Sequence, residues 1–231
     1  KDPLIALSPR QYKPAKQMVF DVVKIGIPGA LITVMLSVSN IVLNNYISLY
    51  GSNAVASYGI AYKIDLFPIM LSVGLSTGIA PLIGFYYGAR QKERLEKTMW
   101  TGTAYGVVLG VIFTALIMTF CRGFASVFLH EEGLVSLTAH FLRLLCFHAP
   151  LLGIINMATS YFQALGKAAS SLAITVLRNV ALFIPGVIIM NYFWQLDGVI
   201  LTQLVVEAAL TVICLIMYVM ASPRRLIQGL S

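Results

Sequence analysis

Charged residues are scarce in this chain: lysine, arginine, aspartate and glutamate make up 11% of its 231 residues, whereas 58% are hydrophobic. A soluble globular domain carries about 25% charged residues, and it exposes too much surface to water to hide so many apolar side chains. Lipid removes that limit. The composition therefore excludes an ordinary soluble domain and predicts an integral membrane protein that uses the lipid bilayer as its partner.

The chain also has little of what metal sites and disulfide frameworks need. Its three cysteines, Cys121, Cys146 and Cys214, lie in or at the end of apolar runs and have no metal-ligand or disulfide spacing. The His130-Glu131-Glu132 segment does not form a zinc-binding HExxH pattern. We find no pairing of a nucleophile with a base. We therefore predict no metal site, no catalytic residue and no enzymatic activity.

Long apolar stretches dominate the sequence, and each is long enough for a transmembrane helix, which needs about 20 residues. They are too long, and lack the alternation, for barrel strands of about 10 residues. The second and fourth exceed the membrane thickness, so we expect them to tilt or kink, with Pro68 and Pro150 well placed for kinks. The sequence predicts an all-α, six-helix membrane bundle with spans at Ile25–Leu49, Ala54–Tyr87, Thr98–Phe120, Gly133–Leu165, Ala168–Phe193 and Gly198–Met220.

The chain has a net charge of +7, and the distribution of its positive residues predicts how it is oriented in the membrane. If the six helices alternate in direction, twelve lysines and arginines in the tails and connections fall on one side of the membrane and only Arg122 falls on the other. Positive residues favour the cytoplasmic side, so both ends of the chain are predicted to be cytoplasmic. Because the positive residues lie in short loops and tails, we expect no nucleic-acid partner.

Five ionisable residues interrupt the predicted spans: Lys63, Asp65, Arg143, Arg178 and Glu207. A charge near the bilayer centre costs at least roughly 2.5 to 3.5 kcal/mol, so such residues face a water-filled cavity or an opposite charge. Counted from the outer helix ends, Lys63, Arg143 and Glu207 share a level roughly 14 Å deep. We therefore predict that Glu207 pairs with Lys63 before Arg178, and that Asp65 pairs with Arg143 or meets water. A structural ion pair and a functional network are both compatible with this pattern.

Uncharged polar residues add to these candidates. Ser37, Asn40 and Asn44 follow an i, i+3, i+7 pattern that predicts one polar stripe on the first helix. Such a stripe suits either a binding pocket or hydrogen bonds between helices. The substrate or ion pathway candidates are Ser37, Asn40, Asn44, Lys63, Asp65, Arg143, Asn156, Arg178, Gln203 and Glu207.

Glycines spaced four apart predict close helix packing. Gly102, Gly106 and Gly110 form such a ladder on the third span, and Gly74 and Gly78 form a shorter one on the second. Small residues at this spacing let helix backbones approach in lipid. The ladder is compatible with static packing or with a sliding interface.

Several motifs, in order, resemble the multidrug and toxic compound extrusion (MATE) transporters, in particular their MepA-like bacterial branch. The first hairpin carries Ile25-Gly26-Ile27-Pro28, Asn44-Asn45 and Gly59-Ile60-Ala61. The second span ends in Pro81-Leu82-Ile83-Gly84-Phe85-Tyr86-Tyr87-Gly88-Ala89-Arg90. Tyr161-Phe162-Gln163-Ala164-Leu165-Gly166-Lys167 and Arg178 followed by Pro185 come later. Each motif is short, but together they cover nearly the whole chain.

The resemblance implies that this chain is the C-terminal lobe of a twelve-helix transporter in the bacterial plasma membrane. Residues 1–24 would be the cytoplasmic interlobe linker, 25–221 the six-helix lobe and 222–231 a cytoplasmic tail. The chain begins with Lys1-Asp2-Pro3, as a segment of a longer protein would. The implied function is efflux of small organic cations or drugs, with no cofactor besides a coupling proton or sodium ion and with an N-terminal six-helix lobe as partner.

The coupling site is left open by the residues themselves, because no aspartate or glutamate lies between Lys24 and Lys63. Alternatives to efflux are a flippase for lipids or lipid-linked sugars of the same wider superfamily, a non-transporting membrane scaffold and a half-transporter that dimerises. A flippase cleft is expected to be strongly basic, whereas the three basic residues in the spans exceed the two acidic ones by only one.

Overall fold

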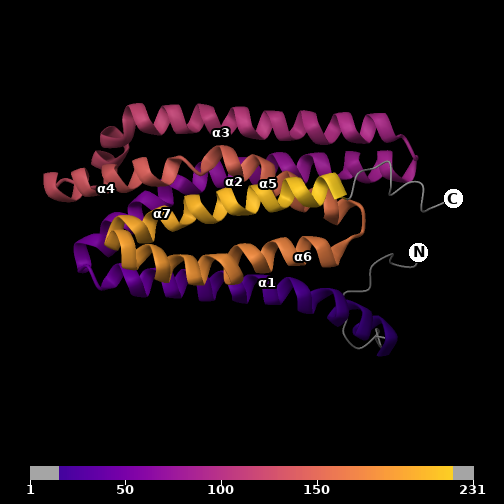
Figure 1. The fold of residues 1–231 in the computed structure, drawn as a ribbon, viewed down its shortest axis with the longest axis horizontal. Coiled ribbons are helices and arrows are strands. Elements are labelled where there is room, and N and C mark those ends of the chain that lie inside the picture. Colours follow the sequence, from indigo (N-terminus) through magenta and orange to yellow (C-terminus); the bar gives the residue numbers. More distant parts are fainter. Residues whose placement is uncertain (1–15, 221–231) are drawn as a thin grey trace, which may run out of the picture.

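The computed structural model describes residues 16–220, and helices joined by short connections account for nearly all of that range (Figure 1). The described range contains no strand, which confirms the predicted all-α class. The helices are α1 (Lys16–Ser48), α2 (Ser52–Gly88), α3 (Lys92–Phe128), α4 (Glu132–Cys146), α5 (Ala149–Ala164), α6 (Ala168–Val176), the π-helical η1 (Leu177–Leu182) and α7 (Phe183–Met220). Residues 1–15 and 221–231, which hold most of the predicted linker and tail, lie outside the described residues.

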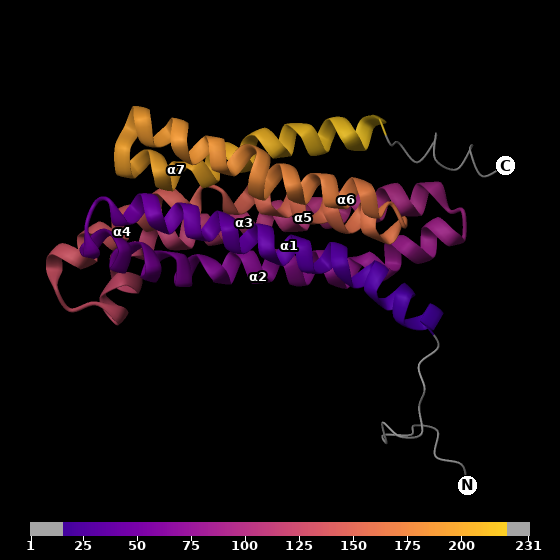
Figure 2. The ribbon, with the colours of Figure 1, turned by 90° about the horizontal axis from the view of Figure 1, so that it is seen from below.

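These elements make six passes along the bundle. α1, α2 and α3 are one pass each, and α4 with α5 forms a fourth that bends by 45°. α6, η1 and the first arm of α7 are the fifth. The chain then reverses at Gln195, whose backbone angles are φ 49° and ψ −132°, and the second arm of α7 is the sixth (Figure 2). The arms touch at the reversal, where Gly198 lies against the carbonyl of Met190. The passes match the predicted spans.

Length and apolar character support a membrane-spanning bundle. In the described chain, α2, α3 and the continuous segment Ala169–Tyr218 are long and apolar enough to cross a membrane, and the bent pair α4–α5 qualifies as a fourth span. Ala169–Tyr218 has 50 residues, which is about 75 Å of straight helix. That length is far more than one crossing needs, so the reversal at Gln195 divides it into two.

The connections alternate between the two ends of the bundle. The α1–α2 turn, the α3–α4 connection and the Gln195 reversal lie at one end, on the left of Figure 1. The α2–α3 and α5–α6 connections lie at the other, with the start of α1 and the end of α7 (Figure 1). Two of these turns need glycine, because Gly51 (φ 100°) and Gly166 (φ 72°) adopt a backbone conformation that side chains disfavour. This alternation is the arrangement that the charge count assumed.

The glycine ladder of α3 packs against α5. A Cβ added at Gly106 would lie 2.9 Å from the Gly153 Cα, and one at Gly110 would lie 2.5 Å from the carbonyl oxygen of Ala149. The backbones of the two helices are therefore in direct contact, as the spacing predicted. Gly74 and Gly78 of α2 differ, since a Cβ at either would meet no atom of the described chain within 4 Å.

The prolines act unequally on the helices. The bend between α4 and α5 lies at Phe147 and His148, directly before Pro150, which occupies the first turn of α5. This is the kink expected at Pro150, because proline supplies no amide hydrogen to bond the preceding turn. α2 continues through Pro68 and Pro81 without interruption. The kink predicted at Pro150 is therefore present and places the buried His148 at the bend, whereas the kink predicted at Pro68 does not interrupt α2.

Candidate functional site

A cavity of about 240 Å³ lies between α1, α2, η1 and the two arms of α7. Residues of α1 and α2 line one part of it, and residues of η1 and of both arms of α7 line the rest. Eight polar side chains line the cavity: Ser39, Asn40, Tyr58, Tyr62, Arg178, Asn179, Gln203 and Glu207. The cavity is therefore a polar space inside an apolar bundle, of the kind that intramembrane charges require.

The strongest interaction in this cavity joins Arg178 to Glu207. Arg178 Nε donates to Glu207 Oε1 at 3.0 Å, and Arg178 Nη2 donates to the same oxygen. Gln203, one helical turn before Glu207, donates from Nε2 to Oε1 at 3.2 Å. The Glu207 side chain is 1% exposed and that of Arg178 is 25% exposed. The pair therefore joins a buried carboxylate to a guanidinium at the cavity wall, and it ties the fifth pass to the sixth.

A π-helical turn places Arg178 in this position. η1 carries Arg178 and Asn179 just before Pro185, and single π turns of this kind are frequent at functional sites. The Ser39 hydroxyl of α1 donates to the carbonyl oxygen of Asn179 and lies 3.0 Å from the carbonyl oxygen of Met35 in its own helix. Thus a side chain from the first pass bonds the irregular backbone of the fifth.

A second buried group lies beside the cavity. Asp65 Oδ2 of α2 lies 3.4 Å from His148 Nε2 at the α4–α5 bend, and the two side chains are 3% and 0% exposed. The other nitrogen of His148, Nδ1, lies 2.6 Å from the carbonyl oxygen of Leu145. A carbonyl oxygen only accepts hydrogen bonds, so Nδ1 is the protonated donor. Asp65 Oδ1 has no hydrogen-bond partner among the described residues.

The structure corrects both predicted ion pairs. Glu207 is held by Arg178, whereas Lys63 is exposed and makes no ion pair with any described residue. Asp65 faces His148 and not Arg143, whose Nε lies 3.3 Å from the sulfur of Cys121. Equal depth along the helices was a poor guide, because it does not fix the direction in which each side chain points.

The predicted polar stripe is only partly in the cavity. Asn40 lines the cavity, but Ser37 and Asn44 are exposed on the outside of α1 and bond carbonyl oxygens of their own helix. Asn156 of α5 donates to the Ser72 hydroxyl of α2 at 3.0 Å, which is a helix-to-helix bond. Of the ten candidates, the cavity brings together Asn40, Arg178, Gln203 and Glu207.

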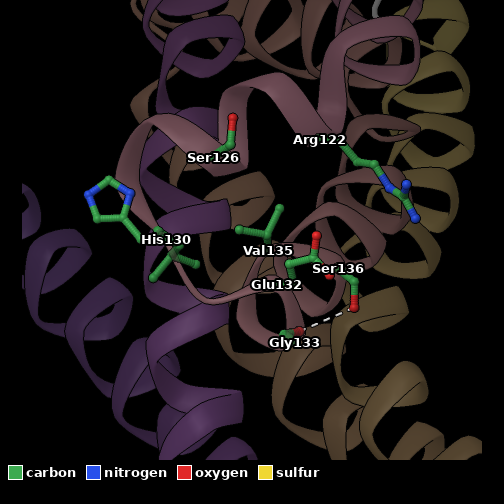
Figure 3. A pocket seen from close by; sticks show the side chains of 8 residues that line it. Arg122, Ser126, His130, Glu132, Gly133, Val135 and Ser136 are labelled. Carbon is green, nitrogen blue, oxygen red and sulfur yellow. Dashed lines mark hydrogen bonds between the residues drawn. The ribbon is translucent and has the colours of Figure 1, made fainter.

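A wider depression of about 600 Å³ opens at the end of the bundle where α3 meets α4. Its polar side chains do not converge: Arg122 and His130 point away from each other in Figure 3. Ser136 bonds its own helix at the Gly133 carbonyl oxygen, at 3.2 Å. We therefore place the candidate site in the smaller cavity between the passes.

Comparison with known proteins identifies the family. The model of the family described as MatE matches residues 28–189. The chain belongs to the MatE family. This membership confirms the resemblance predicted from the motifs.

Curated relatives of the MatE chain include the multidrug export protein MepA of Staphylococcus aureus (strain NCTC 8325 / PS 47). It is 28% identical over 205 residues, which are 89% of this chain and 45% of MepA. The MepA protein of Staphylococcus saprophyticus is 26% identical over 207 residues, which are 90% of this chain and 46% of the relative. The chain spans about half the length of the curated relatives it matches.

Solved structures share the fold. An outward-facing multidrug resistance MATE transporter of the MOP superfamily superposes with a TM-score of 0.81 at 22% identity, covering 99% of this chain and 51% of that one. An inward-facing one gives 0.86 at 22% identity, covering 97% and 51%. A MOP superfamily transporter from Pyrococcus furiosus, described as having reverse polarity of its binding pocket, gives 0.80 at 22% identity, covering 95% and 50%. The six passes therefore form a fold that makes up about half of these transporters.

Several participants in the site are not among the residues predicted from sequence. They are His148 of the buried pair and the cavity-lining residues Ser39, Tyr58, Tyr62 and Asn179. A signal for His148 existed: it lies in the middle of the fourth apolar stretch, two residues before Pro150. Within residues 16–220, no group of three or more histidine, cysteine, aspartate or glutamate residues is placed to hold a metal ion.

Proposed function

We propose that this chain is the C-terminal lobe of a multidrug or organic-cation efflux antiporter driven by a proton or sodium gradient. Its partner would be an N-terminal six-helix lobe facing it across a central cleft. Three findings support the proposal: membership of the MatE family, the names of the MepA relatives, and coverage of about half of those relatives.

The observation that carries the proposal is the buried carboxylate of Glu207 in the wall of the cavity. Tyr58 and Tyr62 line the same space, and the faces of aromatic rings attract cations. An organic cation entering from the open side of the cavity would meet these rings and then compete with Arg178 for Glu207. Aromatic faces with one anchoring carboxylate tolerate cations of different shape, which suits a multidrug transporter.

The cavity favours efflux of cations over a flippase for anionic lipids or lipid-linked sugars. Of the three basic residues in the spans, only Arg178 lines the cavity, and Glu207 neutralises it. Lys63 and Arg143 are exposed and line no part of this cavity. The cavity therefore lacks the excess of positive charge that a phosphate-bearing headgroup would need.

The chain is a multi-pass membrane protein, and we place it in the bacterial plasma membrane with the α2–α3 and α5–α6 connections on the cytoplasmic side. Arg90, Lys92, Arg94 and Lys97 lie at or just after the first of these connections and Lys167 lies in the second. The short cytoplasmic loops of membrane proteins are rich in such residues.

Transport by the intact protein in proteoliposomes tests this function. Ethidium should be moved against its concentration gradient when a pH or sodium gradient is imposed, and it should not move without one. Glu207→Gln should slow transport by on the order of tenfold or more, since about 1.4 kcal/mol of lost binding is a factor of ten. Glu131→Gln is a matched control, because Glu131 is an exposed carboxylate in the α3–α4 connection. Normal transport by Glu207→Gln, or none by the wild type under either gradient, would contradict the proposal.

A further inference from the structure

We infer that the buried pair Asp65–His148 is a proton-binding site and that its proton is the one exchanged for the organic cation. This inference rests on the proposed efflux function and deepens it by naming the coupling ion and the residues that bind it. The pair joins α2 to the bend of the fourth pass and lies outside the cavity lining.

The hydrogen-bonding roles of the two side chains require a proton between them. His148 Nδ1 uses its hydrogen on the Leu145 carbonyl oxygen, so in the neutral ring Nε2 is an acceptor. An ionised carboxylate also only accepts. Asp65 Oδ2 faces Nε2 at 3.4 Å, so two acceptors would point at each other unless a proton lies on one of them.

The burial of the pair makes the protonated form the stable resting state. Neither side chain reaches water, and Asp65 Oδ1 and His148 Nε2 have no hydrogen-bond partner among the described residues. An isolated charge at such a site is costly, and one proton removes it whether it sits on the aspartate or makes an ion pair with the imidazole. With the proton bound, the pair is electrically neutral.

Neighbouring charges give the proton a link to the substrate. The negative charges of Glu207 and Asp65 repel each other, and the positive charge of Arg178 disfavours a positive charge on His148. Arg178 and Glu207 neutralise each other. The four side chains together are therefore neutral when the Asp65–His148 pair holds a proton, and they carry one negative charge when it does not. The other titratable side chains that interact electrostatically with Asp65 are Tyr58 and Tyr62 of α2 and Cys146 of α4, and Cys121 of α3 interacts with Cys146.

This charge balance predicts exchange of one cation for one proton. A cation entering the cavity beside Tyr62 and Glu207 supplies the positive charge that the proton had provided. The proton then leaves the pair for bulk water, giving a carboxylate on Asp65 and a neutral imidazole on His148. The reverse step, protonation of the pair, expels the cation from the cavity. At either stage these four side chains, counted with the proton or the cation that they hold, carry no net charge.

Proton release on substrate binding tests this inference in the purified intact protein. Tetraphenylphosphonium is added in weakly buffered solution with a pH indicator, and its binding is measured in parallel by equilibrium dialysis. We expect the wild type to release about one proton per cation bound, by linkage of the two equilibria. Asp65→Asn and His148→Gln should bind the cation with release near zero, and their binding should lose its pH dependence.

The exposed pair His140–Asp197 offers a matched control. His140 Nε2 and Asp197 Oδ1 are 2.9 Å apart, but their side chains are 47% and 51% exposed, so water can replace the contact. Asp197→Asn should release protons as the wild type does. Release at the wild-type level from Asp65→Asn would overturn the inference, as would displacement of the bound cation by sodium at constant pH without any proton change.

A measurement without substrate separates the two proposals. Between alkaline and acidic pH, the intact wild type should take up about one proton more than Asp65→Asn, because asparagine does not titrate. If Asp65→Asn does not fold, the same titration of His148→Gln and the proton release of the wild type on cation binding still test the inference. If the wild type takes up the additional proton but moves no ethidium, the efflux function is refuted and the proton-binding site at Asp65–His148 stands. If the wild type pumps ethidium but takes up no additional proton, only the proton-binding site is refuted.

Discussion

Arg178 and Glu207 form a charge pair between two passes that are consecutive in the chain and folded back on each other. The guanidinium comes from the π-helical turn of the fifth pass and the carboxylate from the second arm of α7, with two donors from Arg178 to one oxygen of Glu207. The reversal at Gln195 brings these residues together. The pair consequently serves both as a clamp on the helical hairpin and as the polar wall of the cavity.

The first prediction concerns this pair. Removing Arg178 would leave the buried carboxylate of Glu207 unpaired, and removing Glu207 would leave the partly exposed guanidinium of Arg178 unpaired. Breaking a buried pair typically lowers the free energy of unfolding by about 3–5 kcal/mol. Glu207→Gln and Arg178→Met should therefore each lower the folded yield and the melting temperature in detergent, while the double variant should partly recover. Thermal unfolding followed by size-exclusion chromatography measures all three.

Lys63→Met is the control for that cycle. Lys63 is exposed and has no ion pair among the described residues, so its replacement should leave stability within about 0.5 kcal/mol of the wild type. Strictly additive losses for Glu207 and Arg178 would contradict their pairing. A large loss for Lys63→Met with recovery in the Glu207→Gln background would restore the pairing predicted from sequence.

The passes could be predicted from sequence because hydrophobic length is a local property. The third stretch was predicted to end at Phe120, and α3 has a non-helical backbone there (φ −112°, ψ 16°) before it continues to Phe128. The first was predicted to begin at Ile25, but α1 begins at Lys16, since polar residues can extend a helix beyond the apolar run. Ends are less predictable than cores because they depend on what the helix meets there.

The partners within the site could not be predicted in the same way. Counting residues gives depth along a helix but not which neighbour a side chain faces, and η1 changes that direction for Arg178 through a π turn with no marked sequence signal. His148 lies beside Asp65 only because the fourth pass bends at Pro150. Both features arise from packing between passes, which one sequence does not specify.

A second prediction tests the contact between α3 and α5. Gly106→Leu should reduce the folded yield and destabilise the bundle by about 1–3 kcal/mol or more, because the new side chain would have to enter the space of the Gly153 backbone. The matched control is Gly78→Leu in α2, where a Cβ meets no described atom within 4 Å. Equal yields for the two variants would show that the passes can separate freely at this ladder.

A third prediction concerns orientation in the membrane. A cysteine placed at Asn53, beside the α1–α2 turn, should react with an impermeant maleimide added to intact cells, and one at Gln91 in the α2–α3 connection should react only after the membrane is opened. The natural cysteines Cys121, Cys146 and Cys214 are buried and should give little background. The reverse labelling pattern would invert the orientation derived from the lysine and arginine count.

The last prediction is that residues 1–231, expressed alone, insert as a six-pass bundle but do not pump ethidium as a monomer, whereas the intact protein does. The reason is the position of the cavity, one side of which is formed by α1 and α2. Ser37 and Asn44 are exposed on α1 near this wall, and apolar side chains such as Val34 and Ile41 are exposed on the same helix. A facing lobe would cover this surface and turn an open cavity into a cleft that opens to one side of the membrane at a time. Without that cover, a bound cation exchanges with its surroundings and a gradient cannot be coupled to its movement.

Proteoliposomes containing either form, matched for protein content and for the melting temperature of the bundle, give the comparison. Gradient-driven transport by the monomeric chain would refute the need for a facing lobe, and transport that appears only when two copies associate would identify a second copy of the chain as that lobe.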